Sequence, residues 1–175
     1  MDLYLPGCGS PLSLVSFLGS GASSNVYSCS SEPSGQMYAA KVAISSSPSS
    51  SSLSILQNEE HILSQLLYPN RIPIYSNQMA PSPPSSLPSM VALLPCRPDH
   101  HPETLIMQPV GQVLSGELLT DHERMAFGSF PQQITAALRY AHQLGYVHRD
   151  VRPANIILTS KSDPPVSLNF HLIDW

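Results

Sequence analysis

The sequence predicts an α+β fold in which an antiparallel β-sheet with one helix precedes a mainly helical part. Two strand-like segments, 12–18 and 26–29, flank a glycine-rich corner, and a third follows over 36–44. Apolar residues then recur at helical spacing over 53–67, which predicts one amphipathic helix. A second apolar stripe, over 130–144, begins after the strand signals of the first half have ended, and it opens the helical part.

The helix predicted over 130–144 has recognisable ends. Ser129 is placed to cap its first turn, and Pro131 suits that turn because its missing N–H costs nothing there. Gly145 follows the last apolar residue, as expected of a glycine that ends a helix. The apolar stripe consists of Ile134, Ala137, Leu138 and Ala141. Shorter features are a turn at 32–35, strands over 90–94, 104–107, 156–158 and 170–173, and a polar loop over 159–168.

A change from strand to helix signals near Gly111 predicts two domains, residues 1–111 and residues 112–175. Serine and proline dominate two stretches of the first domain, near 45–54 and 76–89. Such stretches bury too little apolar surface to offset the entropy of ordering, so we expect disordered inserts there.

Composition narrows the function classes. The net charge is −4 and only 11% of residues are charged, which argues against a nucleic-acid partner because binding needs clustered Lys and Arg. Cys8, Cys29 and Cys96 lack zinc-ligand spacing and suggest a reduced compartment, the cytoplasm or the nucleus. The sequence shows neither a signal-peptide pattern nor an apolar run long enough for a membrane span, so no membrane is expected.

The segment 146–158 concentrates polar side chains in a short loop between a helix and an apolar strand. Turn chemistry is the simplest explanation of such residues. However, His148-Arg149-Asp150 followed by Asn155 resembles the catalytic loop of protein kinases, H-R-D-x-x-x-x-N. The resemblance implies that Asp150 accepts the proton of a substrate hydroxyl and that Asn155 binds Mg²⁺. Arg152 stands where these kinases usually have lysine, and His148 is expected to pack under the loop.

The corner Gly19-Ser20-Gly21, followed by Val26, resembles the glycine-rich loop that covers ATP phosphates in protein kinases. Glycines there let the backbone approach the phosphates. Ser24 replaces the third glycine, so we expect a side chain at the tip of the corner and a weaker phosphate contact. By itself this stretch fits a plain hairpin corner equally well.

Lys41 interrupts an apolar strand, where an unpaired charge is costly. It resembles the ATP-orienting lysine on the third strand of protein kinases, with Ala39 beside the nucleotide. The helix over 53–67 offers Glu59 as its partner and Glu60 as the fallback. The alternative is a solvated lysine at a strand edge and an exposed acidic helix face.

Three further segments resemble parts of the same family. The end of the strand over 104–107 resembles the hinge between the lobes, so Gln108 and Val110 are expected to contact adenine, together with Ile157. Without the other motifs, an edge strand and a turn would explain that stretch. Asp174 lies where the D-F-G aspartate binds Mg²⁺, with Trp175 in place of phenylalanine.

The resemblance therefore implies a protein-kinase-like α+β fold, with a small β lobe and an incomplete, mainly helical large lobe. The implied function is phosphoryl transfer from ATP, with Mg²⁺, to Ser or Thr of a protein, since Arg152-Pro153 echoes the K-P of Ser/Thr kinases. Because the sequence stops at Asp174-Trp175, we expect weak or no activity and an apolar stripe over 130–144 left partly in water.

Two alternatives remain open. Ile173-Asp174-Trp175 also resembles small-molecule kinases of the aminoglycoside and choline type, although these typically have glycine where Arg149 stands. A pseudokinase-like scaffold that binds a nucleotide without catalysis is the second alternative.

Overall fold

The computed structural model describes residues 12–32, 34–44, 51–67, 92–93, 104–114, 127–161 and 167–175. They fall into two compact units, and the chain passes from the first to the second between Val110 and Gly111. The predicted insert at 76–89 lies outside the described residues, as does most of the insert at 45–54. No helix in the described ranges is both long and apolar enough to cross a membrane.

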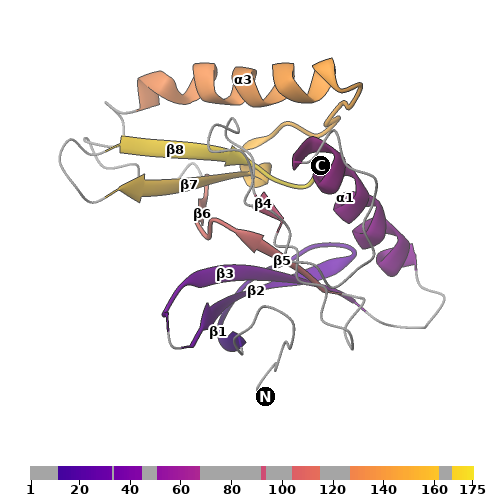
Figure 1. Ribbon diagram of the computed structural model, residues 1–175, viewed down its shortest axis with the longest axis vertical. Coiled ribbons are helices and arrows are strands. Elements are labelled where there is room, and N and C mark those ends of the chain that lie inside the picture. Colours follow the sequence, from indigo (N-terminus) through magenta and orange to yellow (C-terminus); the bar gives the residue numbers. More distant parts are fainter. Residues whose placement is uncertain are drawn as a thin grey trace. The chain divides into compact units, whose positions relative to one another are not determined.

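The first unit is built on a five-stranded antiparallel sheet in the order β1-β2-β3-β5-β4 (Figure 1). Its strands are β1 (Leu12–Ser20), β2 (Ser24–Ser31), β3 (Met37–Ala43), β4 (Ala92–Leu93) and β5 (Thr104–Gln108). The strand period separates two faces. Ala40 and Ile106 pair and join a core with Leu12 and Cys29, whereas Ala43 and Leu105 belong to a second core with Leu56 of the helix.

Helix α1 (Ser51–Leu67) contacts β3, β4 and β5 and buries Leu56, Leu63, Leu66 and Leu67. It begins two residues before the predicted start, so residues 51–54 are helical and the prediction that the serine insert extends to residue 54 is wrong. Tertiary packing supplies most helix stability and extends the first turn backwards. Serine tolerates a helix start because its hydroxyl bonds nearby backbone, as Ser54 Oγ does to the Ser51 carbonyl at 2.8 Å.

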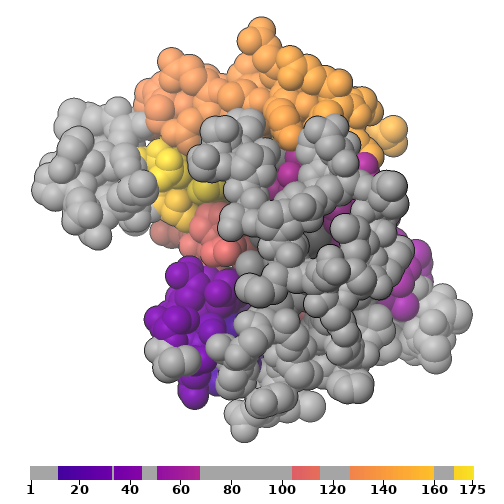
Figure 2. All heavy atoms as spheres, in the orientation of Figure 1, coloured from indigo at the N-terminus to yellow at the C-terminus, as the bar shows by residue number. Residues whose placement is uncertain are grey.

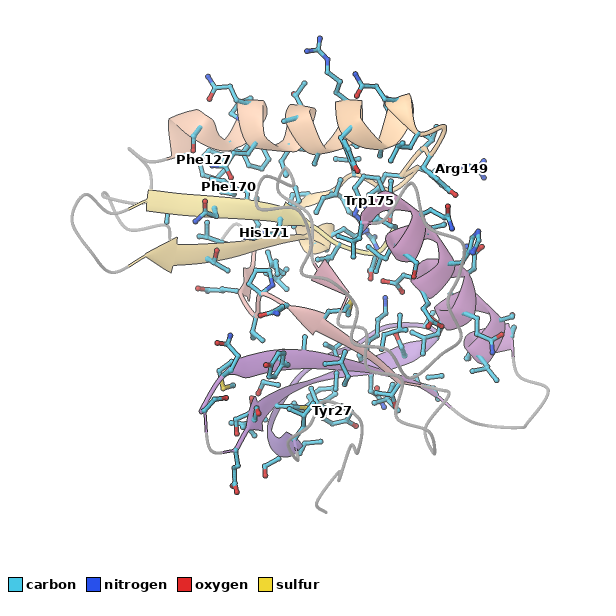
Figure 3. All side chains as sticks on the ribbon, viewed as in Figure 1. Tyr27, Phe127, Arg149, Phe170, His171 and Trp175 are labelled. Carbon is cyan, nitrogen blue, oxygen red and sulfur yellow. The ribbon has the colours of Figure 1, made fainter. Side chains whose placement is uncertain are left out.

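The second unit contains a three-stranded antiparallel sheet and one described helix. The sheet has the order β6-β7-β8, from β6 (Gln112–Val113), β7 (Ile156–Lys161) and β8 (Ser167–Leu172). Helix α3 (Phe130–Gln143) lies along β8, preceded by the 3-10 turn η1 (Phe127–Ser129), and a second 3-10 turn, η2 (Pro153–Asn155), leads into β7 (Figure 1). Phe127, Phe130 and Phe170 join α3 to β8 through ring contacts with centroids 4.8–5.2 Å apart (Figure 3).

Both long strands of this sheet exceed their predicted lengths. β7 continues to Lys161 and β8 begins at Ser167, so much of the predicted loop over 159–168 is strand. Polar residues such as Thr159 and Asn169 pair across the hairpin. Because these residues are polar, the sequence shows no apolar strand pattern there. β6 was not predicted, because two residues are too short to show a period.

The ends of α3 follow the prediction in part. Pro131 lies in the first turn, and Gly145, with φ +85°, follows the cap residue Leu144. Ser129 makes no side-chain capping hydrogen bond, so that prediction is wrong; its hydroxyl instead accepts a bond from Gln133 Nε2 at 2.9 Å.

The apolar stripe of α3 is largely covered within its own unit. Ile134, Ala137 and Ala141 are buried, and Leu138 is half-buried. The expectation that the stripe stays partly in water is therefore wrong for three of its four residues, because β8 packs against them. The opposite side of α3 forms an open surface over much of the helix (Figure 2).

Candidate active-site residues of the two units

A buried ion pair joins β3 to α1 in the first unit. Lys41 is 8% exposed and Glu59 is 5% exposed, and Lys41 Nζ lies 2.6 Å from Glu59 Oε2. The pairing of Lys41 with Leu105 places the lysine on the sheet face that packs against α1. A lone charge at this depth would cost several kcal/mol, so each residue requires the other. The structure thus brings Lys41 to Glu59, the preferred partner in the sequence.

The glycine-rich corner connects β1 to β2. Gly21 N–H donates to the Ser24 carbonyl over 2.8 Å, which leaves Ala22 and Ser23 at the tip. Ser24 is buried and is the first residue of β2, so the expectation of its side chain at the tip is wrong. It pairs with Ala43 of β3, so Ser24 belongs to the sheet and not to the tip of the corner.

Neither the backbone conformation nor the neighbouring atoms require glycine at the two glycine positions of the corner. A Cβ at Gly19 would meet nothing within 4 Å, and one at Gly21 only the Ser24 carbonyl oxygen at 3.7 Å, an ordinary contact. Neither residue has a positive φ. The described surroundings would therefore accept a side chain at both positions.

The other predicted nucleotide contacts lie on both units. Val26 pairs with Gly19 and with Lys41, and Ala39 pairs with Met107 of β5; both are half-buried. Gln108 and Val110 are half-buried where β5 ends. Ile157 belongs to the second unit, where it is buried on β7 opposite His171 and so lies on the sheet face away from α3.

The loop of the second unit places two predicted site residues, Asn155 and Arg152, beside the carboxylate of a third, Asp150. Asn155 Nδ2 donates to Asp150 Oδ2 at 2.8 Å and to the Asp150 carbonyl at 3.0 Å. Arg152 Nε lies 3.1 Å from the same Oδ2, and both Arg152 and Asp150 are exposed. Asn155 itself is buried at the end of η2. The arrangement presents a fixed, accessible carboxylate with a guanidinium beside it.

The orientation of the Asn155 amide follows from its partners. Both of them, a carboxylate and a carbonyl, can only accept hydrogen bonds, so the amide nitrogen must face Asp150. The amide oxygen then points to the other side. An oxygen of this kind suits Mg²⁺, which is usually held in proteins by one or two carboxylates together with phosphates and water. Among the described residues no group of three or more His, Cys, Asp or Glu gathers as a metal site.

Asp174 is held next to this loop through its neighbour Ile173. The Ile173 N–H donates to the Asn155 carbonyl at 2.9 Å, and the Ile173 carbonyl lies 2.7 Å from His148 Nε2. Asp174 is exposed and has φ +61°. The backbone hydrogen bond between Ile173 and Asn155 therefore connects the segments that carry the two predicted metal ligands, Asn155 and Asp174.

His148 makes a more extensive set of bonds than the packing role expected of it. Because the Ile173 carbonyl can only accept, Nε2 must carry the proton, and Nδ1 then accepts the Asp150 N–H at 3.3 Å. The ring also packs on Trp175 at 4.8 Å between centroids, and Trp175 Nε1 donates to the Leu172 carbonyl (Figure 3). His148 thus ties the loop of Asp150 to the strand end that bears Asp174.

Two residues that the sequence reasoning missed hold this unit in shape. Gln133 of α3 bonds both the Leu168 carbonyl and the Phe170 N–H of β8. Gly111 lies so close to β7 that a Cβ would come 2.5 Å from the Leu158 carbonyl oxygen. A glutamine one position from an apolar stripe is a weak signal, whereas a glycine beside a two-residue strand could have suggested a close approach.

In the first unit, burial raises the pKa of the Cys29 thiol.

Comparison with known proteins identifies the family to which these residues belong. The protein kinase domain model matches residues 12–175. Calcium/calmodulin-dependent protein kinase type II of Caenorhabditis briggsae is 27% identical over 151 residues, which are 83% of this chain and 24% of that protein. Serine/threonine-protein kinase PknI of Mycobacterium tuberculosis is 62% identical over 29 residues, 17% of this chain and 5% of that protein.

The chain spans about a quarter or less of the length of these curated relatives. The family model nevertheless covers both units, including Lys41 on β3 and the loop that contains Asp150. The antiparallel sheet with one helix in the first unit agrees with the predicted α+β class. The chain therefore belongs to the protein kinase family.

Proposed function

We propose that this chain binds ATP with Mg²⁺ and transfers the γ-phosphoryl group to a Ser or Thr hydroxyl of a protein. The observation that carries the proposal is the buried ion pair of Lys41 and Glu59. A buried pair of charges is seldom better for stability than a well-packed apolar pair. A functional role therefore explains the buried ion pair better than a contribution to stability does. In that role, the Lys41 ammonium group orients the α- and β-phosphates of ATP.

The glycine-rich corner supports phosphate binding. In the described chain the backbone N–H groups of Ala22 and Ser23 have no hydrogen-bond partner, so they are available to an anion. Gly19 and Gly21 border these amides although the protein surroundings would accept a side chain at either position. A ligand that approaches the backbone closely explains them, together with Ser20 between them and Val26 beyond.

The second unit supplies the groups for transfer. Asn155, through its amide oxygen, and Asp174 would hold Mg²⁺, which neutralises phosphate charge when it is bound. Asp150 accepts the proton of the substrate hydroxyl, and Arg152 beside it offers a cation to the phosphate. Adenine would contact Ala39, Gln108, Val110 and Ile157.

The preference for Ser and Thr rests on Arg152-Pro153 in the loop and on the serine/threonine kinase among the relatives. The proposed partners are ATP and a protein substrate, with neither nucleic acid nor membrane. The cytoplasm or the nucleus is the proposed compartment, because both supply ATP and keep a thiol such as Cys29 reduced.

Calorimetric titration of the whole chain with ATP, with and without Mg²⁺, tests nucleotide binding. We expect binding that needs Mg²⁺, and a loss of about 10- to 100-fold in affinity for Lys41→Met, the worth of one charge-assisted contact. Asp174→Asn should remove most of the Mg²⁺ dependence. Because Lys41→Met leaves Glu59 buried alone, the double variant Lys41→Met/Glu59→Met serves as the control that restores an apolar pair.

Absence of Mg²⁺-dependent binding by the wild-type chain would contradict the proposal, as would unchanged affinity in the folded double variant. Transfer is tested separately, by the phosphoamino acids formed on a generic protein substrate. At most a weak formation of phosphoserine and phosphothreonine is expected from the wild-type chain alone, and none from Asp150→Asn, which should still bind ATP. Phosphotyrosine alone would overturn the Ser/Thr assignment.

A further inference from the structure

Strand β1 is irregular on its way to the glycine-rich corner. Its pairing with β2 shifts between Leu14 and Ser16 and again between Phe17 and Gly19, so Val15 and Leu18 have no partner across the ladder. Both are exposed. Bulges of this kind bend a strand and interrupt its hydrogen bonds, and they are common next to functional sites. The backbone ladder alone therefore holds the corner less firmly than a regular hairpin would.

A side-chain hydrogen bond follows each irregularity. Beyond Val15, Ser16 Oγ lies 2.7 Å from Ser28 Oγ. Beyond Leu18, Ser20 Oγ donates to Asn25 Oδ1 at 2.8 Å. In both cases the two residues are direct partners in the register. The Ser20–Asn25 bond is a side-chain contact within the corner itself, because Ser20 directly precedes Gly21.

We propose that Ser20 and Asn25 are positioning residues that fix the corner in the shape that receives the phosphates of the nucleotide. The inference rests on the proposed function, because it assigns the pair to the same phosphate contact. Their bond joins the two strand ends, so the free amides of Ala22 and Ser23 keep one orientation toward an anion. Prior ordering of this kind raises affinity because less ordering is left for binding.

The Ser16–Ser28 bond provides a matched control in the same hairpin. It is also a serine bond between register partners beyond a bulge, but it lies four residues of β1 further from the corner, about 13 Å along the strand. Ser16→Ala should affect hairpin stability in the same way as Ser20→Ala, without touching the corner. Ser20→Thr retains the hydroxyl and should behave as the wild type does.

The test titrates the whole chain with Mg-ATP and with adenosine, which lacks phosphates. Ser20→Ala and Asn25→Ala should each weaken Mg-ATP binding by about three- to tenfold, the usual effect of one lost ordering contact, and leave adenosine affinity unchanged. The double variant should be no weaker than either single variant. Hydrogen exchange of the amides of residues 21–23 should quicken in Asn25→Ala but not in Ser16→Ala.

An unchanged ratio of ATP to adenosine affinity in both single variants would overturn the inference, as would equal loss in Ser16→Ala. If the wild-type chain binds neither ligand, the proposed function fails. The exchange measurement then decides about the pair by itself, since it needs no nucleotide: unchanged exchange in Asn25→Ala refutes a role in ordering the corner.

Discussion

Among the residues that the structure describes, two that are not glycine adopt left-handed backbone conformations, Arg149 with φ +68° and Asp174 with φ +61°. Each such conformation costs on the order of 1–3 kcal/mol and persists only where surrounding bonds fix it. Here the bonds of His148 and Ile173 tie both backbone segments together. Strain concentrated on both sides of the Asp150 loop agrees with a functional role for that loop.

The conformation of Arg149 leads to a prediction on stability. Arg149→Gly should change the free energy of unfolding by less than about 1 kcal/mol, because glycine adopts this φ without steric cost. Arg149→Val should lower it by about 1–2 kcal/mol or more, because a β-branched residue clashes there. Urea unfolding followed by the fluorescence of the single tryptophan, Trp175, measures both. Equal effects of the two variants would contradict the strained conformation.

Residue identity did not reveal this strain. Only glycine, and to a lesser degree asparagine or aspartate, signals a left-handed residue in a sequence, and Arg149 gives no such signal. The sequence identified the charged groups of the loop correctly as neighbours, but not the backbone that arranges them.

At the scale of elements, Gln133 joins α3 to the outer edge of β8. Its amide oxygen accepts the Phe170 N–H at 2.9 Å, and its amide nitrogen donates to the Leu168 carbonyl at 3.0 Å. Edge strands present unpaired backbone groups that must find partners when they are buried. The Gln133 side chain thus forms hydrogen bonds with two such backbone groups. These bonds fix the position of α3 along β8, the strand that leads to Asp174.

Replacing Gln133 by leucine should therefore destabilise the chain. The Phe170 N–H lies in a fully buried residue, and leaving it and the Leu168 carbonyl without partners costs about 1–3 kcal/mol. Gln132→Leu, at the exposed neighbouring position, is the control and should stay within about 0.5 kcal/mol of the wild type. Urea midpoints of the two variants decide; similar midpoints would show that water replaces the glutamine.

The sequence predicted most elements because their periods are clear, as in β3 and α3. It failed where a strand was too short to have a period, as in β6, and where polar residues continue a strand into a hairpin, as at Thr159. The prediction also extended the serine-rich insert to residue 54, although α1 begins at Ser51. Serine has no propensity strong enough to prevent a helix that packing favours. These failures share one cause, namely that contacts distant in sequence decide the ends of elements.

At the scale of the whole molecule, the sequence placed most candidate site residues on the correct kind of element, although Gly19 and Gln108 belong to strands β1 and β5 and not to the segments that follow them. It could not supply the bonds between the site residues. The choice of Glu59 over Glu60 depended on the register of α1, and the structure provides it through burial of Leu56 and Leu63 on the same side. The tie from His148 to Ile173 spans 25 residues. No local pattern indicates a bond of that range, so the link between Asp150 and Asp174 had to come from the structure.

Each of the two units is compact by itself, so we expect damage to one to remain in that unit. Gly111→Ala tests this, because its Cβ would meet the Leu158 carbonyl at 2.5 Å and a backbone atom cannot move aside cheaply. Overpacking of this kind costs about 1–3 kcal/mol. Hydrogen exchange should quicken for the amides of β7 and leave those of β2 and β3 unchanged. Gly128→Ala, with nothing within 4 Å of the new Cβ, should leave both units unaffected, and faster exchange throughout the chain in Gly111→Ala would show that the units unfold as one.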